Sequence, residues 1–290
     1  MIDRVTIRRP QSPAEYLALQ NVQRLAWELT DDRYLVPVAT LIGADRHGGV
    51  VLGAFEESGE AVGMSFGFLA RFRGQIGLYS QLTGVAAGHQ GRGIGKRLKL
   101  AQQKLTRVQQ LPVIAWAFDP HQFRNAQFNL THLGAAGHEF VPDMYGPRTD
   151  RLNANTPTDR LIVEWKVEPT ARRAVAPKPH SEAQDLVTVR ELVPRFSGFV
   201  PAGHSPVLIS IPTNIGLLRL QRPDLAQAWQ NAAKEAFLTA FAALYVATGV
   251  QLNPSDSRTA QYILEPASWL QERAVTVISG PDHRENRRMV

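Results

Sequence analysis

The sequence predicts an α/β fold built on a mixed (α+β) sheet, followed by a smaller C-terminal β-α-β-β module. Apolar residues switch between strand-like and helix-like periods in the order β-α-α-β-β-β-α-β-α-β-β, which is typical of a sheet with helices on both faces. The 290 residues correspond to about two domains. Pro169 to Glu182 is rich in proline and basic residues, as expected of a linker. We predict a domain at 1–169, a linker at 170–185, a module at 186–270 and a polar tail at 271–290.

The elements of the first domain follow from apolar periods and capping residues. Ser12 and Pro13 supply an N-cap and a first helical position, which predicts a helix over Pro13–Trp27. Apolar residues at 94, 98, 101, 105 and 108 predict a helix over 94–108 with one buried stripe. Helices are also predicted at Val38–Asp45 and Gln122–Leu133, and strands at Val5–Arg9, Val50–Phe55, Ala61–Phe72, Ile76–Val85, Val113–Phe118, near Glu139–Tyr145 and at Leu161–Val167.

The C-terminal module is predicted around one long helix. Pro223 and Asp224 open it with a fixed φ and an acid at the positive helix end, and Gly249 is the expected stop. Its broad apolar face requires a covering partner, either the first domain or a second copy in a homodimer. Short strands are expected at Leu186–Arg190, Val207–Ile211, Val250–Leu252 and Gln261–Leu264.

Composition excludes several classes of protein. Hydrophobic residues make up 44% and charged residues 20%, which is typical of a folded globular chain rather than a disordered one. No apolar run approaches the roughly 18–20 residues that span a bilayer, and no signal-peptide pattern follows Met1, so a cytoplasmic location without a membrane is expected. The absence of cysteine excludes disulfides, a thiol nucleophile and cysteine-ligated zinc. The eight histidines form no metal-ligand spacing, and no metal is expected.

A stretch of the first domain carries only positive charge. Ala61 to Phe118 contains no Asp or Glu but eight cations, while the net charge of the whole chain is +6. The stretch either faces an anionic ligand or is a solvated surface whose acidic partners are distant in sequence. No aromatic residue interleaves with the cations of the basic helix Arg92–Arg107, so nucleic acid is not an expected partner.

The most informative segment is a glycine loop, Gly84 to Lys96, between a predicted strand and a predicted helix, where a phosphate-binding turn belongs. It fails the P-loop pattern at Gln90 and Arg97, and it fails the dinucleotide-binding pattern at Lys96. The pattern Q/R-x-x-G-x-G/A is filled completely by Gln90, Gly93 and Gly95.

This loop resembles the acyl-CoA-binding motif of the GNAT superfamily of CoA-dependent N-acyltransferases. The element order over roughly residues 4–168 resembles that superfamily too, and Asn125 to Gly134 looks like its second CoA-contacting helix. Three further phrases resemble a group of two-part GNAT proteins of poorly defined function: Phe118–Pro120, Arg124–Ala126 and Asp159–Trp165.

The resemblance implies acetyl-CoA or CoA as co-substrate and assigns its contacts. Leu82, Thr83, Gly84 and Val85 would pair with the pantetheine arm, and Asn125 would touch the middle of CoA. Arg92, Lys96 and Arg97 are candidates for the phosphate charge. The pyrophosphate would lie against Gln90, Gly91, Arg92, Gly93, Ile94, Gly95 and Lys96.

The chain departs from the family where proton transfer is expected. Many members carry a carboxylate on the strand before the loop, but Gln75–Val85 contains none, and Leu130 stands where many place a tyrosine. We therefore expect direct attack of an unidentified amine on the thioester at the open end of the sheet, with the Val85 N–H polarising the carbonyl. Proton removal would fall to Tyr79, Asp119 or a water between them, and protonation of the thiolate to Tyr145.

Two alternatives remain. The chain is either an active N-acetyltransferase or a catalytically weak acyl-CoA-binding regulatory or assembly protein. The match of Gly63-Met-Ser65-Phe-Gly67 to a hydrolase nucleophile elbow is rejected, because a strand pattern continues beyond it where an elbow requires a sharp turn into a helix.

Overall fold

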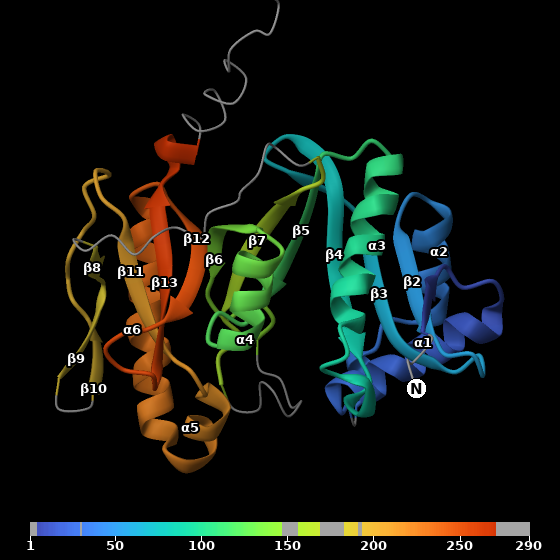
Figure 1. Cartoon of the computed structure of the whole chain (residues 1–290), viewed down its shortest axis with the longest axis horizontal. Coiled ribbons are helices and arrows are strands. Elements are labelled where there is room, and N and C mark those ends of the chain that lie inside the picture. The colour runs from blue at the N-terminus through green and yellow to red at the C-terminus, as the bar shows by residue number, and fades with distance from the viewer. Residues whose placement is uncertain (1–4, 30, 147–155, 169–182, 191–192, 271–290) are drawn as a thin grey trace, which may run out of the picture. The chain divides into compact units, whose positions relative to one another are not determined.

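The computed structural model describes residues 5–29, 31–146, 156–168, 183–190 and 193–270 (Figure 1). Its internal contacts divide the chain into unit 1, Met1–Asp119 with Val141–Glu168, and unit 2, Pro120–Phe140 with Pro169–Val290. The domain predicted at 1–169 differs from this division over Pro120–Phe140. The predicted linker and tail lie mostly or wholly outside the described residues.

Unit 1 is built on a mixed sheet with the order β1-β2-β3-β4-β5-β7. All neighbours run antiparallel except β4 and β5, which are parallel. The strands are β1 (Thr6–Arg8), β2 (Val50–Phe55), β3 (Ala61–Phe72), β4 (Gln75–Val85), β5 (Val113–Phe118) and β7 (Arg160–Lys166). The mixed α/β class predicted from the sequence is therefore confirmed.

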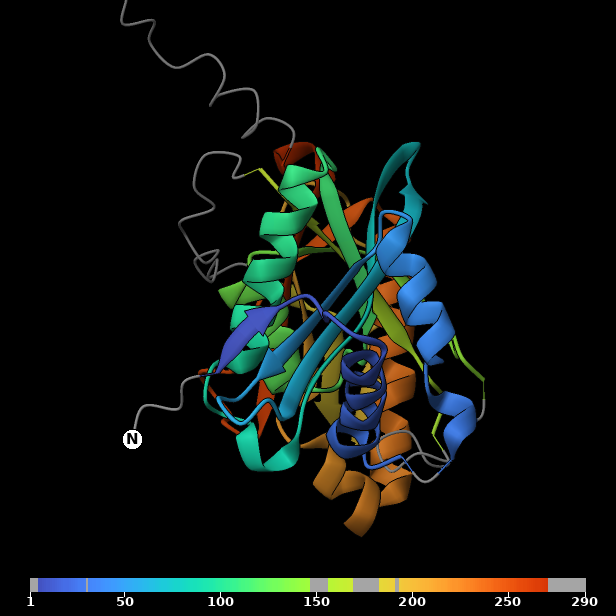
Figure 2. The same ribbon diagram turned by 90° about the vertical axis from the view of Figure 1, so that its right-hand side faces the viewer.

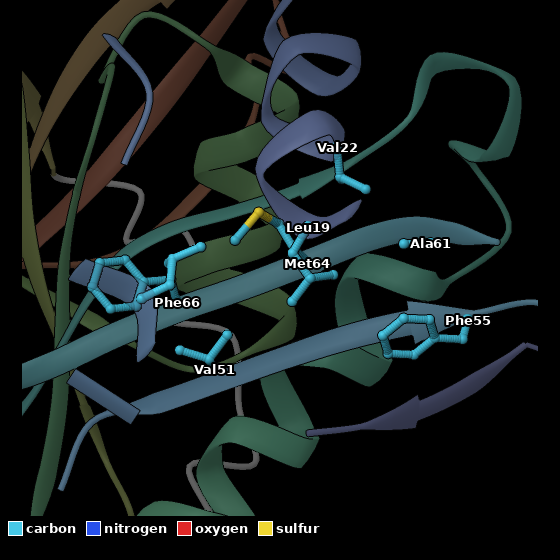
Figure 3. Close-up of a cluster of buried hydrophobic side chains, with 8 residues drawn as sticks. Leu19, Val22, Val51, Phe55, Ala61, Met64 and Phe66 are labelled. Atoms are coloured by element: carbon cyan, nitrogen blue, oxygen red, sulfur yellow. The ribbon is translucent and has the colours of Figure 1, made fainter. Parts of the chain in front are cut away.

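Helices cover both faces of this sheet (Figure 2). On one face lie α1 (Pro13–Trp27) and α2 (Val38–Arg46), and on the other lies α3 (Ile94–Val108). Leu19 and Val22 of α1 pack with Val51 of β2 and Met64 of β3, all at most 1% exposed (Figure 3). Since β2 is buried along its whole length, the centre of the core lies between these layers.

Short segments link these elements. They include the 3-10 turns η1 (Asp32–Tyr34) and η2 (Ala87–His89). The predicted cap of α1 is confirmed, because the side chain of Ser12 accepts a hydrogen bond from the Glu15 amide.

Within unit 2 the strand order is β6-β12-β13-β11-β8, and β9 and β10 form a separate hairpin. The strands are β6 (Ala136–Val141), β8 (Gln184–Asp185), β9 (Val187–Arg190), β10 (Val193–Phe196), β11 (Val207–Pro212), β12 (Tyr245–Leu252) and β13 (Thr259–Pro266). Two helices, α5 (Ile215–Gln221) and α6 (Pro223–Ala242), connect β11 to β12. The segment before β6 forms one turn of α-helix, α4 (Phe123–Ala126), and then a π-helix, η3 (Gln127–His132).

An aromatic cluster forms the core of unit 2. The ring of Phe237 on α6 lies 5.3 Å from Phe140 of β6, 6.0 Å from Phe241 and 5.0 Å from Tyr262 of β13, between ring centroids. The apolar face that the sequence predicts for the long helix is therefore covered in part by strands of its own unit.

Several predicted boundaries are wrong, each for a local reason. The strand expected near Glu139–Tyr145 ends at Val141, because Asp143 has a positive φ and a turn carries Tyr145. The long helix ends at Ala242 rather than Gly249, since Leu244 adopts φ 61°. Gly249 lies inside β12, next to a register shift. Gln122–Leu133 is only partly α-helical. The strand β10 and the helix α5 were not predicted from the sequence.

Two remaining features bear on the expectations from composition. Among the described residues, no helix is both long and apolar enough to cross a membrane. Within the same residues, no group of three or more His, Asp or Glu side chains is placed to hold a metal ion.

Replacing Phe237 tests the aromatic cluster. Phe237→Ala removes a ring that is 0% exposed and leaves a cavity, so we expect a loss of about 3–5 kcal/mol of stability. The neighbouring Leu238 is 42% exposed, and Leu238→Ala should change stability far less. Thermal and urea unfolding measure both variants, and equal losses for the two would contradict the assignment of Phe237 to this core.

Candidate functional site

The glycine loop stands where the sequence places it, between β4 and α3. Gly91 and Gly93 have φ of 78° and 76°, the left-handed region that favours glycine, and Gly93 is the N-cap of α3. A Cβ added at Gly91, Gly93 or Gly95 would meet no heavy atom within 4 Å. The loop therefore leaves open space in front of the helix N-terminus, where backbone amides and the helix dipole favour an anion.

Side chains brace the loop against the end of β4. The Gln90 Nε2 donates a hydrogen bond to the Val85 carbonyl at 3.0 Å, and Arg92 Nη2 donates to the Gly88 carbonyl at 3.0 Å. His89 Nε2 lies 2.8 Å from Glu56 Oε1 on the turn after β2. The hydrogen bond to Val85 explains structurally why a glutamine stands at position 90, since it fixes the loop to the end of β4.

Three of the eight cations of the acid-free stretch have partners distant in sequence. Arg73 pairs with Glu164, Arg107 Nε lies 3.1 Å from Glu168 Oε1, and Arg97 donates to the Val5 carbonyl. Acidic partners distant in sequence, the second alternative for this stretch, are therefore present for Arg73 and Arg107. Arg92 and Lys96 remain exposed at the loop, which makes them the stronger candidates for phosphate charge.

The strand that leads into the loop, β4, pairs with its neighbour β5 over a short stretch and then separates from it. Their ladder consists of two residue pairs, Leu78 with Ile114 and Tyr79 with Ala115. β4 continues to Val85 and β5 to Phe118 without further pairing between them. The two strands therefore diverge, as expected at the open end of the sheet. The edge of β4 that faces β5 is left open to the polar groups of a ligand.

A β-bulge lies at the same point. Gly67 of β3 stands opposite two residues of β4, Ser80 and Gln81, since the pairing passes from Phe66–Leu82 to Phe68–Tyr79. A Cβ on Gly67 would lie 2.9 Å from the Tyr79 carbonyl oxygen. The second glycine of the rejected nucleophile-elbow match is therefore needed for close strand packing.

Ser65 is not a nucleophile in this structure. It is 0% exposed within β3, and its Oγ lies 2.9 Å from Thr83 Oγ1 and accepts a hydrogen bond from Gln102 Nε2 at 3.0 Å. The strand runs on through Phe72, as the sequence analysis expects.

The structure brings two predicted proton-transfer residues together. Tyr79 and Tyr145 are joined by a hydrogen bond between their phenols. Burial raises the pKa of Tyr79 well above its usual value, the charge and hydrogen bond of Tyr145 raise it further, and Arg160 opposes the shift. At neutral pH Tyr79 therefore holds its proton, which suits a hydrogen-bond donor better than the base that the sequence suggested.

A polar brace positions Tyr145. The backbone amide of Tyr145 donates to Thr158 Oγ1 at 2.9 Å, and Thr158, 0% exposed, also contacts Asp143 Oδ1. The guanidinium carbon of Arg160 lies 5.2 Å from the Tyr145 ring centroid. Sequence reasoning missed Thr158 and Arg160, because their role depends on a turn that it extended as a strand.

Asp119, Asn125 and four residues of β4 are the other predicted site residues. Asp119 is the last residue of its segment of unit 1, half-buried just past β5. Asn125 is exposed on α4 in unit 2, where Asn129 Nδ2 lies 3.4 Å from its Oδ1. Leu82, Thr83, Gly84 and Val85 are half-buried along β4.

One functional candidate carries no motif. Lys99 of α3 is 4% exposed, its Nζ donates to Ser80 Oγ at 2.8 Å, and it lies 3.8 Å from the Trp116 ring centroid. Burial lowers the pKa of Lys99 to about 7. Lys99 is one of the eight cations of the acid-free stretch, which the sequence predicts to face a ligand or solvent. Its burial could not be predicted from the apolar period of the helix, because Lys99 lies beside the apolar stripe.

Comparison with known proteins gives matches by structure alone. No known family matches the sequence, and no curated protein matches it. A putative GNAT-family acetyltransferase from Desulfovibrio desulfuricans is 15% identical with a TM-score of 0.44, and it covers 57% of this chain and 99% of its own. A ribosomal-protein-alanine N-acetyltransferase from Brucella melitensis is 22% identical with a TM-score of 0.43, over 56% and 99%.

A third similar structure, a putative acetyltransferase from Salmonella typhimurium with its cofactor acetyl-CoA, is 18% identical with a TM-score of 0.43, over 60% of this chain and 99% of its own. GNAT acetyltransferases are therefore among the solved structures to which this chain is similar, as the glycine loop predicts. At these identities and TM-scores the likeness by itself assigns neither an activity nor a substrate.

Replacing Gly67 tests the bulge. Gly67→Ala places a methyl group 2.9 Å from the Tyr79 carbonyl, so β4 must shift, at about 1–3 kcal/mol of stability. Gly43 of α2 has nothing within 4 Å of its added Cβ, and Gly43→Ala should leave stability unchanged or raised. Thermal unfolding compares the two, and an unaffected Gly67→Ala variant would show that close packing at the bulge is not required.

Proposed function

We propose that this protein is a CoA-dependent N-acetyltransferase that moves the acetyl group of acetyl-CoA to an amine by direct attack. The observation that carries the proposal is the open glycine loop at the N-terminus of α3, at the end of a strand that has parted from its neighbour. A helix N-terminus of this kind binds phosphate groups through backbone amides and its dipole.

The residues present fit CoA. The open space at Gly91, Gly93 and Gly95 would admit a pyrophosphate against main-chain amides, with Arg92 and Lys96 exposed beside it. Leu82 to Val85 occupy the stretch of β4 between the loop and the end of the β4–β5 ladder. Their main chain is the surface that we assign to the pantetheine arm, and Asn125 is assigned a contact with CoA as well.

The reaction needs one proton removed and one supplied. The amine nitrogen forms a bond to the acetyl carbon, the carbon–sulfur bond breaks, the amine loses a proton and the sulfur gains one. Tyr79, protonated and hydrogen-bonded to Tyr145, is assigned the donation to sulfur. Tyr145 is 40% exposed, so it links Tyr79 to solvent and restores its proton.

Asp119 is the remaining candidate for taking the amine proton, directly or through water. The chain has no cysteine, and Ser65 is buried in a strand, so an acyl-enzyme on either residue type is not part of the proposal. The Val85 N–H stays assigned to polarising the thioester carbonyl.

A binding protein without appreciable turnover is the second candidate. It is favoured by the absence of a carboxylate on β4. In that case acetyl-CoA would bind, and amine-dependent release of free CoA would be absent. A homodimeric state and a cytoplasmic location stay predictions.

Ligand-induced stabilisation tests the CoA site. Acetyl-CoA at about a hundred times its dissociation constant should raise stability by about 2.7 kcal/mol and so raise Tm. Gly93→Val places a side chain in the phosphate space and should abolish this shift.

The matched control is Gly59→Val. Gly59 has φ 88° and the same empty surroundings, but it lies in the turn between β2 and β3. Both variants carry the same kind of backbone strain, so a similar fall in unliganded Tm is expected. Loss of the acetyl-CoA shift in both variants, or in neither, would refute the proposed site.

Kinetics test the proton-transfer assignments. Tyr79→Phe should lower kcat by about 10²-fold or more, and Tyr145→Phe should lower it less, because water can replace an outer phenol. Asp119→Asn should lower the rate by a similar factor if Asp119 takes the amine proton. Free-CoA release with a panel of amines and with acetyl-, propionyl- and succinyl-CoA gives the assay. Rates within about threefold of the parent for all three variants would reject these roles.

A further inference from the structure

The face of α3 that packs on the sheet is polar along much of its length. The apolar stripe expected from the sequence ends in Val108, which is 73% exposed, whereas Lys99, Gln102 and Thr106 are at most 4% exposed. The sheet beneath is polar too, because Ser65, Ser80 and Thr83 lie on this side. A buried polar layer therefore separates α3 from β3 and β4.

Lys99 occupies a special place in this layer. The β4–β5 ladder ends at Tyr79 and Ala115, so Ser80 and Trp116 are the first residues of each strand beyond it. Lys99 contacts both of them, through the hydrogen bond to Ser80 and the face of the Trp116 ring. Its amine therefore bridges the two strands at the point where they separate.

No opposite charge compensates this amine in the part of the chain that the structure describes. Its only cause of pKa shift is burial, and its one hydrogen bond there goes to Ser80. The other side chains of the polar layer are uncharged: Gln102 of the same helix bonds to Ser65 of β3, which bonds to Thr83 of β4. The Trp116 ring that Lys99 contacts packs in turn on the edge of Trp165 of β7. Two acidic side chains of unit 1 are paired with other cations: Glu164 with Arg73, and Glu15 with Arg8 of β1. β2 has no titratable side chain.

A group with these properties responds to any negative charge that arrives nearby. The glycine loop begins α3, and Lys99 lies five residues after Ile94, about 7.5 Å along the helix axis. Because Lys99 itself is enclosed in a low-dielectric interior, an anion bound in front of Ile94 favours the charged form of the lysine, across a separation greater than this rise. An anionic ligand at the loop and the ammonium of Lys99 therefore stabilise each other.

We propose that Lys99 is a positioning residue for the acyl-CoA thioester: its amine holds β4 and β5 apart at the end of their ladder and takes up a proton from solvent when acyl-CoA binds. The inference rests on the proposed function, since acyl-CoA supplies the anion. It adds a residue that acts through the strands and not by contact with the reacting atoms.

Binding to the wild-type protein gives the first test. Calorimetry with acetyl-CoA at pH 8 in two buffers of different ionisation enthalpy should show uptake of about 0.4 proton per ligand, if the midpoint of Lys99 rises from about 7 to about 8. Affinity should then be about fivefold weaker at pH 9 than at pH 7, because the protonated form binds more tightly. Phosphate groups, which titrate near pH 6, contribute little above pH 7.

A pair of lysine variants isolates the group. Lys99→Met keeps the length of the side chain without its charge, and it should lose most of the proton uptake and flatten the affinity between pH 7 and 9. Lys104 is exposed on the same helix, and Lys104→Met removes the same charge from α3 but should keep both effects. Equal uptake in Lys99→Met and the parent would assign the proton to another group and overturn the proposal.

A ligand-free measurement separates this inference from the proposed function. Because the folded pKa of Lys99 lies below its unfolded value, the unfolded chain binds more protons between about pH 7 and 10, and stability should rise with pH there. Lys99→Met should reduce this slope, and NMR titration of the Lys99 side chain should show a midpoint near 7 in the parent protein. If acetyl-CoA does not bind at all, the proposed function fails; if it binds without proton uptake, the role of Lys99 fails alone.

Discussion

The parting of β4 from β5 is the constraint on which the candidate site depends. Two parallel strands that pair at only two positions leave backbone groups of both strands without the partners that a full ladder supplies. The bulge opposite Gly67 turns β4 at the same place, and only a glycine allows the approach to the Tyr79 carbonyl. The glycine loop follows at the far end of β4, so one strand connects the loop, the open edge and Tyr79.

The opening is stabilised by polar groups on one face and by aromatic rings on the other. On the α3 side, Lys99 and Gln102 bond to side chains of the sheet. On the opposite side, the Tyr79 ring packs 5.4 Å from Phe68 and 6.3 Å from Phe72, between ring centroids. Burial of unpaired polar groups destabilises a protein, so a buried lysine without a carboxylate reduces stability where the strands diverge. This loss of stability is located where β4 and β5 must stay apart to leave the site open.

In unit 2, hydrogen bonds of polar side chains hold strands together. The Asp185 carboxylate accepts hydrogen bonds from the Ser210 amide at 3.1 Å and from Gln261 Nε2 at 3.1 Å, and it ties β8, β11 and β13 together. The Tyr262 hydroxyl donates to the Pro120 carbonyl at 2.6 Å and joins the segment 120–140 to the C-terminal sheet. These bonds explain why that segment belongs to unit 2 although the sequence places it inside the first domain.

The sequence by itself determined the elements with strong local signals and the loop motif. The caps at Ser12 and Pro223, the wholly apolar β5 and the alternating glycines act over a few residues, so their structures follow from local chain geometry. The tertiary structure alone decided which face of α3 is buried, because the serines and threonine beneath it come from strands elsewhere in the chain. It also decided the contact between Tyr79 and Tyr145 and the burial of Lys99. Those features depend on distances between segments that are far apart in sequence, and no periodicity of a single segment records them.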